Sequence, residues 1–182
     1  MKVTVLGRGN VGGGLARLWR EAGHEVDELG RDGGDASGAD ALLVAVPSDQ
    51  IADALGKVSG VEGKVTIDAT NALAGRPDGF DSLAEYAKSI TGGPAAKAFN
   101  LNFARNYDKI REQANTPSQV YCGDDGARDV TEQLIRDAGY EPVFAGGLEN
   151  ARALEDAIGM LFGVMQAAGE PVFYRMGKPG EL

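Results

Sequence analysis

A glycine-rich turn near the N-terminus constrains the fold of this chain more than any other feature. The turn reads Gly7-Arg8-Gly9-Asn10-Val11-Gly12. It follows a short apolar run at residues 3–6 and opens a segment with apolar residues at helical spacing, so it joins an expected strand to an expected helix. The first glycine permits the tight bend, the second lets the backbone approach a pyrophosphate, and the third lets the helix pack closely on the strand. The helix N-terminus adds unpaired N–H groups, so the turn predicts binding of an anionic dinucleotide.

The rest of the chain predicts an α/β fold with a doubly wound parallel sheet, because expected strands and helices alternate. Further strands are expected at residues 25–29, 41–46, 64–69, 96–100, 119–122 and 141–145. Helices are expected at residues 11–22, 47–58, 83–90, 130–138 and 151–165. We find no internal repeat and no low-complexity linker, and therefore expect a single domain over residues 1–182. Its core would span residues 1–146, and a C-terminal helix and tail would span residues 147–182.

Charge and composition argue against several classes of protein. The chain has 18 Lys and Arg against 27 Asp and Glu, a net charge of −9, so it lacks the positive footprint that nucleic acid or an anionic membrane requires. With one cysteine, Cys122, and one histidine, His24, it cannot build a disulfide framework or a Cys/His zinc site. No apolar run approaches the length of a membrane span, and no signal peptide precedes the first strand. We expect a cytoplasmic protein with no metal, nucleic-acid or membrane partner, in which His24 and Cys122 are structural.

The end of the second expected strand decides between NAD and NADP. An acidic residue there would bind the ribose diol, whereas an arginine would pair with a 2′-phosphate. The segment Glu28-Leu29-Gly30-Arg31-Asp32 contains both types. Arg31 could pair with the phosphate and stack on adenine, or it could be a solvated loop residue. We favour NADP.

Two further strand ends would meet the cofactor at the carboxyl edge of the sheet. Val46, Pro47 and Ser48 follow the third strand, and we expect them against the nicotinamide ribose, with a plain helix cap as the alternative. Asn71 follows the fourth strand and could either bond the nicotinamide carboxamide or cap the turn.

Several segments together resemble the deazaflavin (coenzyme F420)-dependent NADP oxidoreductases and their dinucleotide-binding relatives. Besides the glycine turn and Gly30-Arg31, they are Ala22-Gly23-His24-Glu25-Val26, Ile67-Asp68-Ala69-Thr70-Asn71, Lys97-Ala98-Phe99-Asn100, Tyr121-Cys122-Gly123-Asp124-Asp125 and Ala145-Gly146-Gly147-Leu148-Glu149-Asn150-Ala151-Arg152. The resemblance covers nearly the whole chain.

This resemblance implies a Rossmann-type domain with a small C-terminal helical extension that binds NADP(H). It also implies hydride transfer between C4 of the nicotinamide and C5 of a deazaflavin, or a flavin-like acceptor. Such a reaction depends on holding two rings face to face, so no catalytic acid or base is expected from the protein. Topology and the resemblance together place the pocket for the second ring at Asn100, Leu101, Asn102 and Phe103.

Other interpretations remain open from the sequence. An NADPH-dependent reductase of a small carbonyl or imine would need a proton donor, for which Tyr107, Lys97 and Tyr86 are the candidates. A noncatalytic NADP(H)-binding redox sensor would carry the same glycine turn. The last helix has a broad apolar face that could serve a homodimer or pack on its own sheet, and the apolar tail at residues 171–176 could cap the site or contact a second subunit.

Overall fold

The structure of the protein is a computed structural model, and it describes residues 1–180. Its strands are β1 (Lys2–Leu6), β2 (Glu25–Leu29), β3 (Gly34–Asp35), β4 (Ala41–Val44), β5 (Val58–Ser59), β6 (Val65–Asp68), β7 (Ala95–Lys97), β8 (Ser118–Gly123) and β9 (Glu141–Phe144). Its α-helices are α1 (Asn10–Glu21), α2 (Ile51–Gly56), α3 (Leu83–Thr91), α4 (Asp125–Asp137) and α5 (Ala151–Ala168). Three 3-10 helices, η1 (Ser48–Gln50), η2 (Ala104–Glu112) and η3 (Leu148–Asn150), complete these elements.

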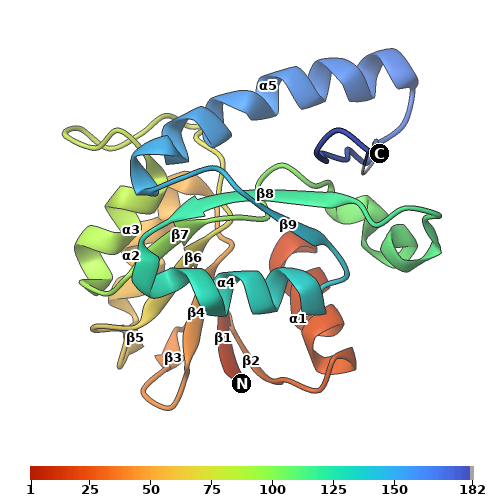
Figure 1. Ribbon diagram of the computed structural model, residues 1–182. Coiled ribbons are helices and arrows are strands. Elements are labelled where there is room, and N and C mark those ends of the chain that lie inside the picture. The colour runs from red at the N-terminus through yellow and green to blue at the C-terminus, as the bar shows by residue number, and fades with distance from the viewer. Residues whose placement is uncertain (181–182) are drawn as a thin grey trace.

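A seven-stranded sheet forms the centre of the fold, in the order β2-β1-β4-β6-β7-β8-β9 (Figure 1). The five strands from β2 to β7 are parallel, with Val3 paired to Val26 on one side and to Ala41 on the other. β4 is apolar and fully buried, and β1 is buried from Val3 to Leu6, because neighbouring strands on both sides and helices on both faces cover them. This arrangement brings the carboxyl ends of β1, β4 and β6 to one edge of the sheet.

Helices cover both faces of the sheet. On one face α1 and α4 contribute Leu15, Trp19 and Leu134 to a buried cluster with β1. On the other face α2 and α3 pack Ile51 and Leu83 against β4, and α5 packs against β8. The predicted architecture, a mostly parallel α/β sheet of Rossmann type with a C-terminal helix, is therefore confirmed.

The direction of the last two strands differs from the all-parallel prediction. β8 pairs antiparallel to β7, with Lys97 opposite Cys122, and β9 runs parallel to β8. A parallel neighbour would require a crossover back to the opposite end of the sheet. The connection from β7 to β8 instead contains η2, which packs against α1, and β8 extends past the carboxyl end of β7.

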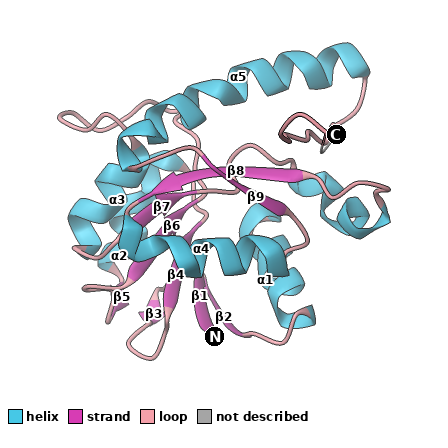
Figure 2. Cartoon of the chain, viewed as in Figure 1, coloured by secondary structure: helices cyan, strands magenta, loops and turns pink. Residues whose placement is uncertain are grey.

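Some predicted boundaries are wrong for local reasons. The helix expected to reach Val58 ends at Gly56, and Val58 lies in the short strand β5, which pairs with β3. The strand expected to reach Asn100 ends at Lys97, because Phe99 adopts a left-handed conformation with φ of 63°. The segment 71–81 is a loop as predicted (Figure 2).

Of the two residues expected to be structural, one is fully buried and the other, His24, is partly buried. Cys122 is fully buried and makes no disulfide among the described residues, and burial is the main cause that raises the pKa of its thiol to about 12. The His24 Nε2 atom lies 2.7 Å from Asp137 Oδ2, which joins the start of β2 to the end of α4. Across residues 1–180, none of the helices combines the length and apolar character needed to span a membrane.

Candidate functional site

The turn between β1 and α1 places three glycines with different surroundings. A Cβ atom on Gly12 would lie 1.9 Å from the carbonyl oxygen of Gly7, so only glycine allows α1 to begin this close to β1. A Cβ atom on Gly9 would meet no atom of the described chain within 4 Å. The turn is therefore tightly packed at Gly12 and open at Gly9, where the N-terminus of α1 is accessible to a ligand.

A cavity of about 900 Å³ opens directly beside this turn. We call it the larger cavity. Its lining comes from the ends of β1 and β4, the turn after β2, and α2: Leu6, Gly7, Arg8, Gly9, Gly30, Arg31, Ala45, Val46, Pro47, Asp49, Gln50, Asp53, Ala54 and Lys57. The cavity thus combines an open helix N-terminus with three basic and two acidic side chains.

The basic side chains of the larger cavity come from three separate elements. Arg8 donates from Nε and Nη2 to the carbonyl oxygen of Glu28 at 3.1 and 2.8 Å, and its guanidinium lies over Gly30. Arg31 is exposed in the turn after β2. Lys57 follows α2, and its Nζ pairs with Asp53 Oδ2 at 2.7 Å.

The turn that carries Arg31 is fixed against the backbone of Lys57. The amide of Gly34 donates to the carbonyl oxygen of Lys57 at 3.2 Å, and a Cβ on Gly33 would lie 2.0 Å from that same oxygen. This contact belongs to the small sheet of β3 and β5. It brings the turn of Arg31 next to Lys57, and both residues line the larger cavity although they lie 26 positions apart in the sequence.

The acidic residue at the end of β2 is turned away from the larger cavity. Glu28 Oε1 accepts a hydrogen bond from Arg20 Nη1 at 2.6 Å, on the side of α1. Asp32 does not line the cavity either. Near the end of β2 the larger cavity is therefore lined by Arg31 and by neither of these two carboxylates, while Asp53 lines it from α2, paired with Lys57.

A second cavity of about 390 Å³ lies beside the first, and we call it the smaller cavity. It shares Ala45, Val46, Pro47 and Asp49 with the larger one. The rest of its lining comes from α1, the start of η1 and the segment that follows β6: Val11, Ser48, Ala69, Thr70, Asn71, Leu73 and Ala74. The two cavities together follow the carboxyl edge of the sheet from β2 to β6.

Two asparagines form a reciprocal pair beside the smaller cavity. Asn71 Nδ2 donates to the carbonyl oxygen of Asn100, and Asn100 Nδ2 donates to Asn71 Oδ1, both at 3.0 Å. Asn100 Nδ2 also reaches the carbonyl oxygen of Leu154 on α5. The pair joins the loop after β6 to the segment after β7 and holds both against α5.

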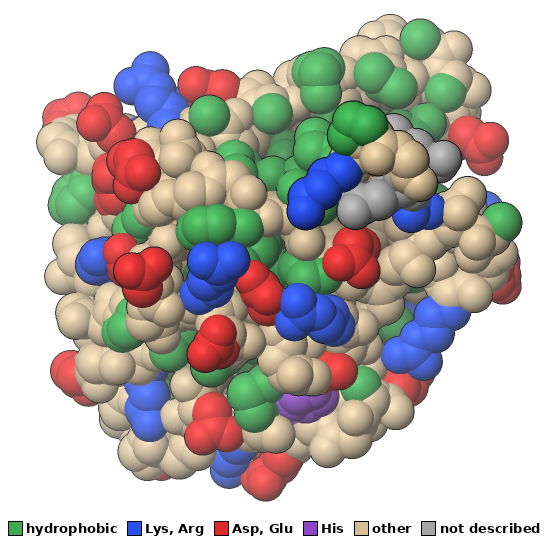
Figure 3. Space-filling model, viewed as in Figure 1, with side chains coloured by type: hydrophobic (Ala, Val, Ile, Leu, Met, Phe, Trp, Pro, Cys, Tyr) green, Lys and Arg blue, Asp and Glu red, His purple; other side chains and the backbone are tan. Residues whose placement is uncertain are grey.

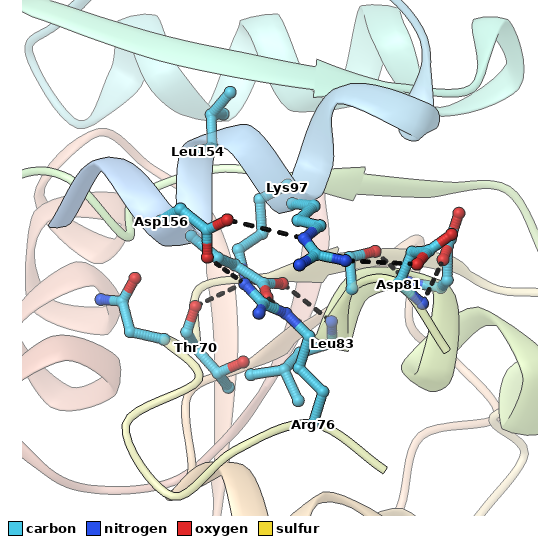
Figure 4. A network of polar contacts seen from close by, with 12 residues as sticks. Thr70, Arg76, Asp81, Leu83, Lys97, Leu154 and Asp156 are labelled. Atoms are coloured by element: carbon cyan, nitrogen blue, oxygen red, sulfur yellow. Dashed lines mark hydrogen bonds and ion pairs between the residues drawn. The ribbon is translucent and has the colours of Figure 1, made fainter. Parts of the chain in front are cut away.

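A buried ion cluster lies behind the same strand ends (Figure 4). Lys97 is fully buried, and its Nζ lies 2.6 Å from Asp68 Oδ2 and 2.9 Å from Glu155 Oε1. Arg76 continues the cluster, with Nε 2.8 Å from Glu155 Oε2 and Nη2 2.6 Å from Asp156 Oδ1. The cluster attaches the loop 71–81 and the ends of β6 and β7 to α5.

The predicted cofactor-binding residues divide between the two cavities. Gly7, Arg8, Gly9 and Arg31 line the larger cavity, and Val46 and Pro47 line both. Val11, Ser48 and Asn71 line the smaller cavity. Asn10 begins α1 and Gly12 is buried beneath the turn, and neither lines a cavity.

The residues predicted to hold a second ring lie deeper than expected. None of residues 100–103 lines either cavity. Asn100, Leu101 and Asn102 are buried, and Asn102 Nδ2 donates to the carbonyl oxygen of Ser118 and to Gln119 Oε1. Phe103 contacts Phe162 of α5, with 5.9 Å between ring centroids. Their role in holding a second ring stays a prediction.

The three candidate proton donors also lie outside the cavity linings. Lys97 is enclosed in the ion cluster. Tyr107 is buried with its ring against Gly14, and burial raises the pKa of its hydroxyl. Tyr86 packs edge-on against Phe80, with 5.0 Å between ring centroids.

Several residues of the cavity linings are not among the predicted cofactor-binding residues: Gly30, Asp49, Gln50, Asp53, Lys57, Thr70 and Leu73. Lys57 carries no sequence signal, because the connection after α2 reaches the cavity only through the small sheet. Thr70 was visible as a neighbour of Asn71 at a strand end. Within residues 1–180, no group of three or more His, Cys, Asp or Glu side chains is arranged to hold a metal ion.

Comparison with known proteins gives a match of structure alone. No family model matches the sequence, and no curated protein matches it. A provisionally assigned F420-dependent NADP reductase from Arthrobacter sp. FB24 superposes with a TM-score of 0.81 over 98% of this chain and 100% of the other, at 22% identity. A hypothetical protein of Sinorhizobium meliloti gives a TM-score of 0.66 at 24% identity, over 82% of this chain and 86% of the other.

A longer enzyme shares the same architecture. A reductive aminase from Aspergillus terreus, solved with NADPH and ethyl 5-oxohexanoate, gives a TM-score of 0.66 at 14% identity. The match covers 92% of this chain and 62% of the aminase. At these identities the comparisons show a shared Rossmann-type fold.

Proposed function

We propose that this protein is an oxidoreductase that uses NADP(H). The observation that carries the proposal is the pair of connected cavities along the carboxyl edge of the sheet, cationic at one end and nearly uncharged at the other. NADPH, with an anionic 2′-phosphate on its adenine ribose and a neutral reduced nicotinamide, has a complementary distribution of charge. The fold likeness to a protein named as an NADP reductase and to an aminase solved with NADPH supports this assignment.

The described residues fit the cofactor at three points. The open side of Gly9, at the N-terminus of α1, would receive the pyrophosphate. Arg31 and Lys57 would hold the 2′-phosphate, which is the reason to prefer NADP over NAD, since Glu28 is paired with Arg20. Val46, Pro47 and Ser48 would lie along the nicotinamide ribose, and Asn71 near the nicotinamide.

We further propose a deazaflavin or flavin-like molecule as hydride acceptor. The smaller cavity has one ionisable side chain in its described lining, Asp49, and that residue is exposed. When bound, reduced nicotinamide supplies a hydride, and a ring that accepts it at carbon needs no proton from the protein in the same step. The chain would therefore contribute position and exclusion of water rather than acid–base chemistry. The name of one structural neighbour agrees with this acceptor.

Reduction of a small carbonyl or imine is the second candidate, and the fold likeness to the reductive aminase favours it. That reaction needs a proton donor near the nicotinamide. Tyr107, Lys97 and Tyr86 all lie outside the cavity linings. This candidate therefore has less support from the site than the first.

Binding measurements on Arg31→Ala test the choice of cofactor. We expect the wild-type protein to bind NADPH more tightly than NADH, and the variant to lose about tenfold in affinity for NADPH with little change for NADH. A charge-assisted hydrogen bond of this kind contributes about 1.5–3 kcal/mol. Equal losses of affinity for NADPH and NADH would contradict the assignment of Arg31 to the 2′-phosphate.

Anaerobic mixing of the protein with NADPH and oxidised deazaflavin coenzyme tests the acceptor. Loss of the visible absorbance of the deazaflavin, dependent on the protein, is the expected result. If NADPH binds and no bleaching follows, the deazaflavin is not the acceptor, and flavins, small carbonyls and imines would be tried next. Binding without turnover of any acceptor would favour a redox-sensing module.

A further inference from the structure

One buried hydroxyl group in the smaller cavity has no partner. Thr70 is 5% exposed and lines the smaller cavity, and its Oγ1 makes no hydrogen bond to any of the described residues. Buried polar side chains are satisfied in most structures, so each exception requires an explanation. Because Thr70 belongs to the wall of the smaller cavity, we consider a ligand bound there as the partner of this hydroxyl.

The backbone of Thr70 is held on both sides by the buried ion cluster (Figure 4). Its amide donates to Asp68 Oδ1 at 3.0 Å, and its carbonyl oxygen accepts from Lys97 Nζ. Both side chains are at most 1% exposed, and Glu155 fixes Lys97 from the side of α5. The backbone that carries the hydroxyl is thus fixed before any ligand arrives, which lowers the entropy cost of binding at this residue.

The chemistry of the smaller cavity selects a neutral polar ligand group. Its polar side chains other than Asp49 are uncharged: Ser48, Thr70 and Asn71. The amide of Asn71 already exchanges hydrogen bonds with Asn100. Thr70 therefore offers a buried polar atom without a partner among the described residues, and a hydroxyl both donates and accepts. A primary amide, which also donates and accepts, matches it better than a phosphate or a carboxylate.

We propose that the Thr70 hydroxyl binds the carboxamide of the nicotinamide and so fixes the orientation of that ring. This inference rests on the proposed function, because it assumes that NADP(H) is the dinucleotide. It assigns the contact to Thr70, while Asn71 and Asn100 support the adjacent backbone.

Thr70→Val tests the assignment, because valine keeps the shape of threonine and removes the hydroxyl. The matched control is Thr4→Val. Thr4 is also buried, its Oγ1 also has no partner among the described residues, and it lines neither cavity. Two probes separate the ends of the site: NADPH, and 2′,5′-ADP, which lacks the nicotinamide.

We expect Thr70→Val to weaken NADPH binding about three- to tenfold, as measured by calorimetry, and to leave 2′,5′-ADP unchanged. Thr4→Val should leave both affinities unchanged, and Thr70→Ser should bind NADPH like the wild type. If Thr70→Val does not fold, the pair Thr70→Ala and Thr70→Ser gives the same comparison.

Three results would overturn the assignment. An unchanged affinity of Thr70→Val for NADPH would show that the hydroxyl makes no contact with the cofactor. An equal loss of affinity for NADPH and 2′,5′-ADP would indicate a general distortion of the site instead. In both cases the wild type still binds NADPH, and the proposed function stands. Failure of the wild type to bind either probe would overturn the proposed function as well.

Discussion

Gly9 and Gly12 lie in the same turn and are glycines for different physical reasons. At Gly12 a side chain would collide with the backbone of Gly7, whereas at Gly9 it would enter open space beside the larger cavity. The φ of Gly9 is −79°, which other residues adopt without strain. Gly12 is therefore required by the fold, and Gly9 is available for a ligand.

Gly9→Ala and Gly12→Ala should consequently separate binding from stability. We expect Gly9→Ala to lower the free energy of unfolding by less than about 1 kcal/mol, as an N-cap change, and to weaken NADPH at least about tenfold. Gly12→Ala should cost about 3 kcal/mol, because its Cβ overlaps a backbone oxygen. Urea unfolding and calorimetry give the two quantities. Normal NADPH affinity in a folded Gly9→Ala variant would contradict the placement of the pyrophosphate.

Lys57 and Lys88 offer a second matched comparison at the scale of residues. Each is paired with an aspartate, at 2.7 and 2.8 Å, and their side chains are 45% and 41% exposed. Only Lys57 lines the larger cavity. We expect Lys57→Gln to weaken NADPH about tenfold with no effect on NADH, because it removes one cation from the 2′-phosphate. Lys88→Gln should change neither affinity; equal losses of NADPH and NADH in Lys57→Gln would contradict the assignment.

At the scale of elements, α4 is tied to β8 by a carboxylate. Glu132 on α4 accepts a short hydrogen bond from the Tyr121 hydroxyl, and Arg136 and Arg128 pair with the same carboxylate at 2.8 and 3.2 Å. The Tyr121 hydrogen bond is the largest cause that lowers the pKa of Glu132 to about 2. The ionised form is thus favoured in the folded state.

This lowered pKa predicts how stability depends on pH. A carboxyl group with a lower pKa in the folded state stabilises the protein above its unfolded pKa, about 4.5, and that contribution is lost as the pH falls towards 2. We expect the free energy of unfolding to decrease over this range in the wild type, and to decrease less in Glu132→Gln and in Tyr121→Phe. Urea unfolding at several pH values provides the measurement. Equal slopes in all three proteins would show that this contact contributes nothing in solution.

At the scale of the whole molecule, charge and apolar surface are unevenly distributed. A chain of net charge −9 presents three basic side chains in its larger cavity. The C-terminal half of α5 carries no charge from Ala157 to Ala168 and exposes Met160, Phe162 and Val164. Hydrophobic side chains gather near α5 and the tail on the face seen in Figure 3, and charged ones are interspersed over the rest.

The exposed apolar side chains at the C-terminal end of α5 are the reason that we still predict a homodimer. The apolar tail does not cover it, because Tyr174 is held by Val120 and Asn102, and Met176 by Ser118. We expect sedimentation velocity to give twice the chain mass of 19.0 kDa for the wild type and a single chain for Val164→Glu. Leu73→Glu, at an exposed residue of the loop 71–81, should leave the dimer intact. A monomeric wild type would contradict the prediction.

The sequence by itself determined most of the longer elements and the location of the glycine-rich turn. Strand and helix periodicities are local, so β1, β2, α1 and α3 were predicted to within one residue, whereas α4 begins five residues before its predicted start. The spacing of Gly7, Gly9 and Gly12 located the turn between β1 and α1. The wrong strand boundary at β7 also has a local cause, because the left-handed conformation of Phe99 ends the strand early.

Only the tertiary structure decided which side chains from distant segments share a site. The antiparallel direction of β8 depends on the path of residues 98–117, and the approach of Lys57 to the turn of Arg31 depends on the pairing of β3 with β5. The support of Thr70 by Asp68, Lys97 and Glu155 joins three elements through buried charges. Such contacts arise from packing between segments far apart in sequence, and no periodicity or motif within one segment encodes them.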